Sequence, residues 1–215
     1  SDGAVVLDDA WVGNAGALES EWDFDCARIA FSGAFGKSPS PTHTFYPIID
    51  SLKSAAGKPV TLSLDSDGYP GVWSKDVASS WTISKDGPAD DWKSLSGLIA
   101  KDIYLSAYSG SGHYNDLGLL AAGRKESSLS GVEKETQFTM WCALASPLFL
   151  GCDLSQLSSY ELGLVSNKEL IAVNQDPLGL QAELVSVAGG VYVLAKDLEE
   201  KFGLKRAVAL YNPTD

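Results

Sequence analysis

The residues of this sequence best suited to chemistry are carboxylates that directly follow short apolar runs. Asp8 and Asp9 follow one such run, and Asp86 follows another, at 81–83. Other aspartates placed in this way are Asp65, Asp67 and Asp116. Carboxylates at strand ends can serve as acid, base or nucleophile, although Asp near Gly and Pro also makes ordinary turns and helix caps. For the whole set, a polar pocket is the better interpretation.

Aromatic residues near the same loops would give such a pocket flat faces on which sugar rings stack, with ordinary packing as the alternative. These residues are Trp11, Trp73, Trp81 and Tyr114. The two histidines, His43 and His113, have no Cys or carboxylate at helical ligand spacing. We therefore expect no metal site, and no motif predicts a cofactor. No serine lies in a nucleophile elbow, and 109–112 lacks the lysine of a phosphate-binding loop.

Composition narrows the range of partners. The 215 residues are 45% hydrophobic, and 16 basic against 28 acidic side chains give a net charge of −12. Such a field repels nucleic acid and anionic lipid, and no run reaches the ~18 apolar residues of a membrane span. Neutral substrates remain, of which sugars are the obvious class. The three cysteines, Cys26, Cys142 and Cys152, allow at most one disulfide.

Short apolar runs alternate with helical patterns, which is typical of βαβ units around a parallel sheet. The expected strands are 4–7, 28–31, 59–64, 81–83, 147–151 and 171–173. Helices are expected at about 92–105, from the capping box Ser130–Glu133 to about Ala145, and after the capping boxes Ser158–Glu161 and Ser166–Glu169. In a (β/α)-barrel, polar residues that follow the strands form the face where active sites lie.

The pattern changes after Gly179. Three runs at 182–187, 191–195 and 207–211 resemble strands, and Gly189-Gly190 marks a hairpin turn between the first two. We predict that 1–179 form a (β/α)8 TIM-barrel-like domain and that 180–215 begin an antiparallel β domain. A complete barrel takes ~250 residues, so we expect the barrel to be incomplete or reduced, or the sequence to belong to a larger chain or assembly.

Two runs carry a resemblance to a known family: MWCALASPLFLGCDL at 140–154 and IAVNQDPLG at 171–179. Together with Tyr114-Asn115-Asp116 and the run LDDAW at 7–11, they resemble glycoside hydrolase family 27, the α-galactosidases (melibiases). The similarity extends through most of 4–212. It implies a (β/α)8 barrel followed by an antiparallel β domain, and retaining hydrolysis of terminal α-galactosides by two aspartates. It also implies an extracellular or a lysosomal or vacuolar location, although residues 1–20 show no signal peptide.

The resemblance also implies roles for particular residues. The family's nucleophilic Asp follows a Lys and an aromatic residue, and here the matching run is Ala30-Phe31-Ser32, which places Ser32 at the nucleophile position. Asp86 stands at the acid/base position, although Trp81-Thr82 replaces the family's Trp-Arg pair. Gly118 replaces a second aspartate close to Asp116. The implied substrate-binding residues are Asp8, Asp9, Trp11, Trp81 and Asp116.

A neutral serine hydroxyl needs a partner base before it can attack, whereas a retaining glycosidase uses an ionised carboxylate. We therefore expect a catalytically impaired domain that binds galactoside-like carbohydrate or serves a structural or interaction role. The alternative is an active α-galactosidase-type hydrolase with Asp86 as acid/base, or an inverting enzyme with Asp65 or Asp67 as base. A domain with a purely structural role and no ligand is the third reading.

Overall fold

The computed structural model describes part of the chain, and the chain divides into two units, residues 1–85 and 86–215. The described residues are 25–30, 46, 49–50, 54, 59–66, 68–84, 89–199 and 206–214. The expected strand at 4–7 lies outside them. The predicted domain boundary at 179/180 stays a prediction.

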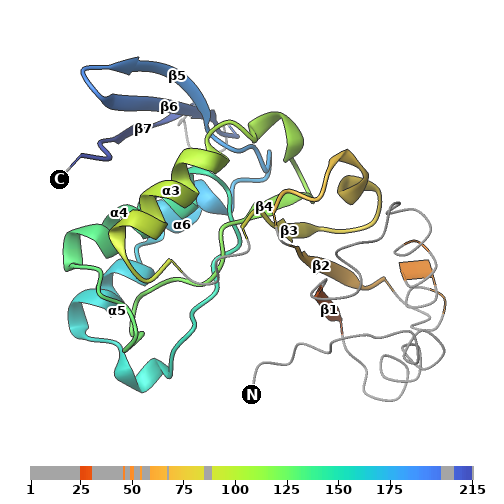
Figure 1. Ribbon diagram of the computed structural model, residues 1–215, viewed down its shortest axis with the longest axis horizontal. Helices are drawn as coiled ribbons and strands as arrows, with labels where there is room; N and C mark the ends of the chain where they lie inside the picture. The colour runs from red at the N-terminus through yellow and green to blue at the C-terminus, as the bar shows by residue number, and fades with distance from the viewer. Residues whose placement is uncertain are drawn as a thin grey trace. The chain divides into compact units, whose positions relative to one another are not determined.

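The first unit is built on a parallel sheet, as the alternating pattern predicts. Strands β1 (Cys26–Ala30), β2 (Thr61–Asp65) and β3 (Ser80–Thr82) lie side by side in that order, and all run in the same direction (Figure 1). A short 3-10 helix, η2 (Val72–Asp76), connects β2 to β3. The strands bury apolar side chains as strands of a covered parallel sheet do. Among them are Ile29, Leu62, Leu64 and Trp81.

Helices dominate the first two thirds of the second unit. They are α3 (Trp92–Asp102), α4 (Gly131–Ala143), α5 (Ser159–Val165) and α6 (Lys168–Asn174), accompanied by η3 (Ser106–Tyr108), strand β4 (Tyr114–Asp116) and η4 (Leu154–Gln156). The predicted capping boxes at Ser130–Glu133 and Ser158–Glu161 are confirmed. In each, the serine side chain accepts the backbone N–H of the glutamate, and the glutamate side chain accepts the backbone N–H of the serine. Helix α4 buries Phe138, Trp141 and Cys142. All three cysteines of the chain are free thiols.

Two of the expected strands are wrong. The apolar run at 171–173 belongs to helix α6. The N-cap of this helix is Asn167 rather than Ser166, because the Asn167 side chain accepts the N–H groups of Glu169 and Leu170. The run at 147–151 forms no buried strand. It makes one parallel bridge, between Leu150 and Leu120, and leaves Phe149 half exposed.

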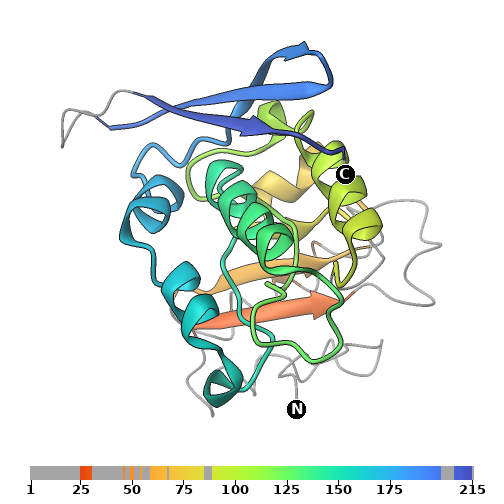
Figure 2. The same cartoon turned by 90° about the vertical axis from the view of Figure 1, so that its left-hand side faces the viewer.

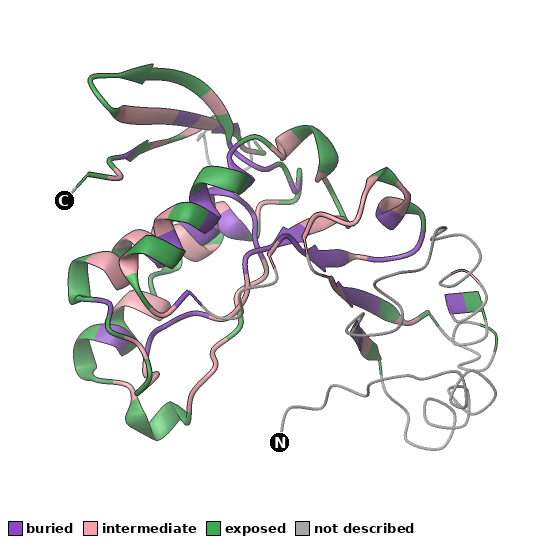
Figure 3. Cartoon of the chain, viewed as in Figure 1, coloured by how far each residue is buried: buried purple, intermediate pink, exposed green. Residues whose placement is uncertain are grey.

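The antiparallel sheet expected near the end of the sequence is confirmed. Strands β5 (Glu183–Ala188), β6 (Val191–Asp197) and β7 (Arg206–Tyr211) pair in sequence order. Gly189 and Gly190 form the turn between β5 and β6 with φ of 58° and 86°, left-handed values that a two-residue hairpin loop requires. Most of β5 is exposed (Figure 3).

The sheet lies on one side of helices α3 and α4 (Figure 2). Tyr211 of β7 contacts Trp92 at the start of α3, with ring centroids 6.5 Å apart. Lys196 of β6 is buried on the same face as Leu194. Within the part of the chain that the structure describes, no helix has the length and apolar character needed to span a bilayer.

Candidate functional site

The carboxyl ends of β1, β2 and β3 form a polar edge on the first unit. Ala30, the last residue of β1, pairs in register with Asp65, the last residue of β2. Arg28 precedes Ala30 by two residues, and its guanidinium lies 3.4 Å from a carboxylate oxygen of Asp65. The side chains of Arg28 and Asp65 are 33% and 43% exposed. The edge therefore presents a carboxylate beside a cation, both open to solvent.

Hydrogen bonds between β2 and β3 fix the position of this carboxylate. The Ser66 N–H donates to Thr82 Oγ1 at 2.7 Å. The Thr82 hydroxyl has one proton of its own, and its acceptors are Ser66 O at 2.9 Å and Asp65 Oδ1 at 3.3 Å. The Ser66 hydroxyl in turn lies 3.0 Å from Thr82 O. Because the ends of both strands are tied in this way, Asp65 stands on rigid backbone rather than on a free loop.

The edge offers hydrogen-bonding groups to a neutral ligand. A carboxylate next to a guanidinium offers both acceptors and donors for the hydroxyl groups of a neutral ligand. Retaining glycosidases place two carboxyl groups ~5–5.5 Å apart. Of the described residues at the ends of these three strands, only Asp65 carries a carboxylate, since Ala30 stands opposite it on β1 and Thr82 ends β3.

Trp81 does not present a ring face to solvent in this structure. It is completely buried, and its ring meets that of Tyr69 edge-on at a centroid distance of 6.4 Å. Edge-to-face packing of this kind stabilises a core. Its predicted part in substrate binding stays a prediction. Tyr69, which the sequence pattern did not single out, is half-buried beside it.

Asp116 shapes the turn that follows β4. The residue is 1% exposed, and its Oδ1 accepts the N–H of Gly118 at 2.8 Å. Gly118 has φ of 87°, and its carbonyl accepts the indole N–H of Trp141 at 3.0 Å. This is the local bond by which Asp commonly stabilises turns. Its expected sugar contact therefore stays a prediction alongside an observed structural role.

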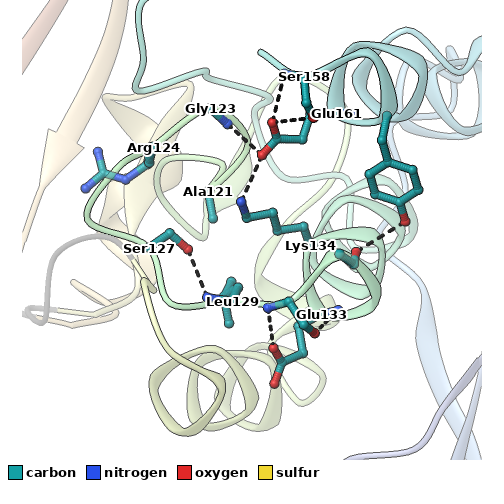
Figure 4. Close-up of polar contacts among 12 residues, drawn as sticks. Ala121, Gly123, Arg124, Ser127, Leu129, Glu133, Lys134, Ser158 and Glu161 are labelled. Carbon is teal, nitrogen blue, oxygen red and sulfur yellow. Dashed lines mark hydrogen bonds and ion pairs between the residues drawn. The ribbon is translucent and has the colours of Figure 1, made fainter. Parts of the chain in front are cut away.

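Charged side chains anchor the loop at 117–130, which follows β4 (Figure 4). Arg124 makes a two-pronged bond to Asp90, with both N–O distances at 2.9 Å. Glu161 of α5 accepts Lys134 Nζ at 2.8 Å and the Gly123 N–H at 3.1 Å through Oε1, while its Oε2 accepts from Ser158. The sequence offered no signal for either contact beyond the capping box at Glu161.

These contacts change the ionisation of Glu161. Burial alone would raise the pKa of its carboxyl group, but hydrogen bonds from Lys134 and from Gly123 and Ser158 lower the pKa to about 2. The side chains of Glu161 and Lys134 are 12% and 16% exposed. The Asp90 contact likewise raises the pKa of Arg124. The loop after β4 is thus held by ion pairs that persist over a wide pH range.

The remaining predicted site residues lie outside the described residues. These are Asp8, Asp9, Trp11, Ser32 and Asp86. Within the described ranges, no group of three His, Cys, Asp or Glu side chains could hold a metal ion.

Comparison with known proteins places the chain in a family. The family model described as alpha galactosidase A matches residues 14–176. The chain belongs to glycoside hydrolase family 27, the α-galactosidase family. An α-galactosidase of Oryza sativa subsp. japonica is 32% identical over 195 residues, which are 90% of this chain and 45% of the rice protein.

Solved structures of family 27 share the fold. Alpha-galactosidase I of Mortierella vinacea matches with a TM-score of 0.78 and 26% identity, covering 94% of this chain and 55% of that one. The α-galactosidase of Saccharomyces cerevisiae with raffinose matches with a TM-score of 0.78 and 22% identity, covering 94% and 51%. The predicted fold class, a partial (β/α)8 barrel followed by the start of an antiparallel β domain, is confirmed.

This chain spans about half the length of the family 27 relatives that it matches, or less. In a (β/α) barrel the functional groups come from the ends of several strands. The polar edge at Arg28 and Asp65 lies at the carboxyl ends of β1 and β2, the end of the strands at which barrel enzymes generally build their sites.

The Glu161 contacts yield a pH-dependent prediction. Because the pKa falls from the usual 4.5 to about 2 on folding, the carboxylate contributes stability that is present above about pH 4.5 and lost as the pH falls toward 2. We expect Glu161→Gln to lower the free energy of unfolding by roughly 3 kcal/mol at neutral pH, since it leaves Lys134 poorly paired. In urea unfolding measured at a series of pH values, the free energy of unfolding of this variant should fall less steeply in acid than that of the wild type.

The matched control is Glu133→Gln, which changes the same position of the capping box of α4. Gln serves well at that position, so the control should cost well under 1 kcal/mol. Equal losses for the two variants would contradict the role of Glu161 as an anchor.

Proposed function

We propose that this family 27 domain binds galactoside-like carbohydrate at the polar edge of β1–β3 and is impaired in glycoside hydrolysis. The observation that carries the proposal is the pairing of Asp65 with Ala30 across the strand ends, beside the Arg28 guanidinium. Of the described residues at the ends of these three strands, only Asp65 carries a carboxylate, whereas a retaining glycosidase uses two. Ser32 at the family's nucleophile position, as the sequence resemblance implies, supports the same conclusion.

The proposal separates binding from cleavage on physical grounds. Binding a sugar needs donors and acceptors in fixed positions. Bonds between the ends of β2 and β3 hold Asp65 and Thr82, and Arg28 of β1 pairs with Asp65. Cleavage needs an ionised carboxylate to stabilise the positive charge that develops at the sugar carbon. A serine hydroxyl is neutral at pH 7 and cannot supply that charge. The raffinose named with the yeast relative supports carbohydrate as the ligand class.

A working α-galactosidase is the second candidate. The relatives in rice, Mortierella and yeast are all named α-galactosidases, and Asp86 stands at the acid/base position by resemblance. In that case Asp86 would protonate the leaving oxygen, and Asp65 or Asp67 would activate a water in an inverting reaction, which needs ~6.5–9.5 Å between the carboxyl groups.

Hydrolysis of nitrophenyl α-galactoside separates these candidates. We expect the wild-type chain to release no more nitrophenol than Asp86→Asn, because no nucleophile is available. Release of nitrophenol by the wild type that Asp86→Asn abolishes would contradict the proposal. The double variant Ser32→Asp with Ala30→Lys restores the residues of the family pattern, and we expect it to hydrolyse the substrate. Adding Asp86→Asn to this double variant should abolish that hydrolysis.

Calorimetric titration with galactose tests binding at the polar edge. We expect heat at millimolar sugar and about tenfold weaker binding by Asp65→Asn, since a hydrogen bond to a charged group is worth about 1.5–3 kcal/mol. The control is Asp76→Asn, a change to a residue of η2 that lies four positions before β3 begins. No heat from the wild type, or equal losses in both variants, would count against sugar binding at this edge.

A further inference from the structure

Asp102 is a buried carboxyl group in the second unit, far in sequence from the residues of the polar edge. It is the last residue of α3 and is completely shielded from solvent. Gln181 Nε2 donates to the Asp102 backbone carbonyl at 2.7 Å and to Oδ2 at 3.2 Å. Within the described part of the chain, Asp102 Oδ1 has no hydrogen-bond partner. An ionised carboxylate would be poorly compensated at such a place.

The orientation of the Gln181 amide is determined by its other neighbours. Its Oε1 accepts the Ser109 hydroxyl and the Asn115 Nδ2 group, both at 2.9 Å. Two donors on the oxygen side force the NH₂ group to face Asp102. Asn115 Nδ2 also lies 3.3 Å from the carbonyl of Leu105. Gln181 therefore joins three segments: the end of α3, the stretch from η3 to β4, and the residues that lead into β5.

No cation compensates Asp102 among the described residues. The groups that face it are the amides of Gln181 and Asn115, which are neutral. Lys101, its neighbour on α3, is exposed, and Lys196 of β6 donates instead to the carbonyl of Val173 in α6. Burial raises the pKa of Asp102 to about 8, against the smaller lowering effect of the bonds from Gln181 and Asn115. The carboxyl group is thus neutral in the folded chain at neutral pH.

We propose that the contact between Asp102 and Gln181 is a proton-dependent clasp, which holds the first strand of the antiparallel sheet on helix α3 most firmly while Asp102 is protonated. The next residue continues the attachment, because the Ala182 N–H donates to the carbonyl of Ala143 in α4 at 3.0 Å. Strand β5 begins at Glu183. Ionisation of Asp102 would place an uncompensated charge at the point where this strand is joined to the helices. The clasp is independent of the proposed sugar binding.

The sign of the effect follows from the two ionisation states. The unfolded carboxyl group has the ordinary pKa of 3.8, and the folded one has a pKa of about 8. Between these values the folded chain binds one more proton, so stability is greatest in acid and is lost as the pH rises through about 8. The folding equilibrium constant should fall by up to about tenfold for each pH unit in this window.

Hydrogen exchange and urea unfolding of the whole chain, between about pH 5 and about pH 7.5, test the clasp. Asp102→Asn keeps the shape of the protonated carboxyl group and cannot ionise. Hydrogen exchange gives an opening constant for each amide of residues 181–188. We expect the ratio of the wild-type constant to that of Asp102→Asn to rise about tenfold per pH unit. The control Asp91→Asn changes the N-cap at the other end of α3 and should show a constant ratio, because Asn is an equally good cap.

A ratio for Asp102→Asn that stays constant with pH, or that changes as much in Asp91→Asn, would overturn the proposal. An NMR titration of the aspartate carboxyl carbons of the wild type gives a readout that depends on no variant. One carboxyl group must titrate close to about pH 8, and its signal must disappear in Asp102→Asn if that variant folds. The absence of any aspartate that titrates above about pH 6 would also overturn the proposal.

Discussion

Donors from the segment 181–196 satisfy carbonyl groups at the ends of three helices in the second unit, and the antiparallel sheet depends on this. The last carbonyls of a helix have no partner within it. Gln181 bonds the carbonyl of Asp102 in α3, the Ala182 N–H bonds that of Ala143 in α4, and Lys196 Nζ bonds that of Val173 in α6 at 2.6 Å. Polar contacts of this kind require one register, because a slip by one residue would turn Lys196 to the opposite face.

The attachment places two titratable groups in buried positions. Lys196 is 2% exposed, and burial lowers its pKa to about 8 against the raising effect of Asp176. A cation at a helix C-terminus is favourable, because the carbonyls there carry partial negative charge. Asp102 has no such compensation among the described residues, and burial raises the pKa of its carboxyl group to about 8. The helices and the sheet are thus joined through groups whose charge depends on the environment that folding creates.

Much of the fold could be predicted from local pattern. The capping boxes at Ser130 and Ser158 and the turn at Gly189-Gly190 specify their elements through bonds between residues close in sequence. The prediction of a strand at 171–173 was wrong because a run of three β-branched and small residues fits a strand or a helix equally well. The Asn167 side chain caps two N–H groups of helix α6, whereas Ser166 is the C-cap of α5 and its hydroxyl donates to the carbonyl of Leu162.

The candidate site was less predictable, because its contacts join residues distant in sequence. Asp65 could be recognised as a strand-end carboxylate, but Arg28 meets it only through the register of β1 with β2. The same holds for Arg124 with Asp90 and for Gln181 with Asp102. Family resemblance supplied the expected roles of Ser32 and Asp86, whereas the register of Ala30 with Asp65 is seen only in the sheet.

Covalent trapping tests the central claim, that this family 27 domain lacks a working nucleophile, most directly. A fluorinated galactosyl fluoride forms a long-lived glycosyl-enzyme with a retaining glycosidase, because the fluorine slows the hydrolysis of the intermediate that such enzymes form. The intact mass of the wild-type chain after incubation is the measurement. We predict no gain in mass, and a gain of one fluorogalactosyl group on an aspartate would contradict the claim.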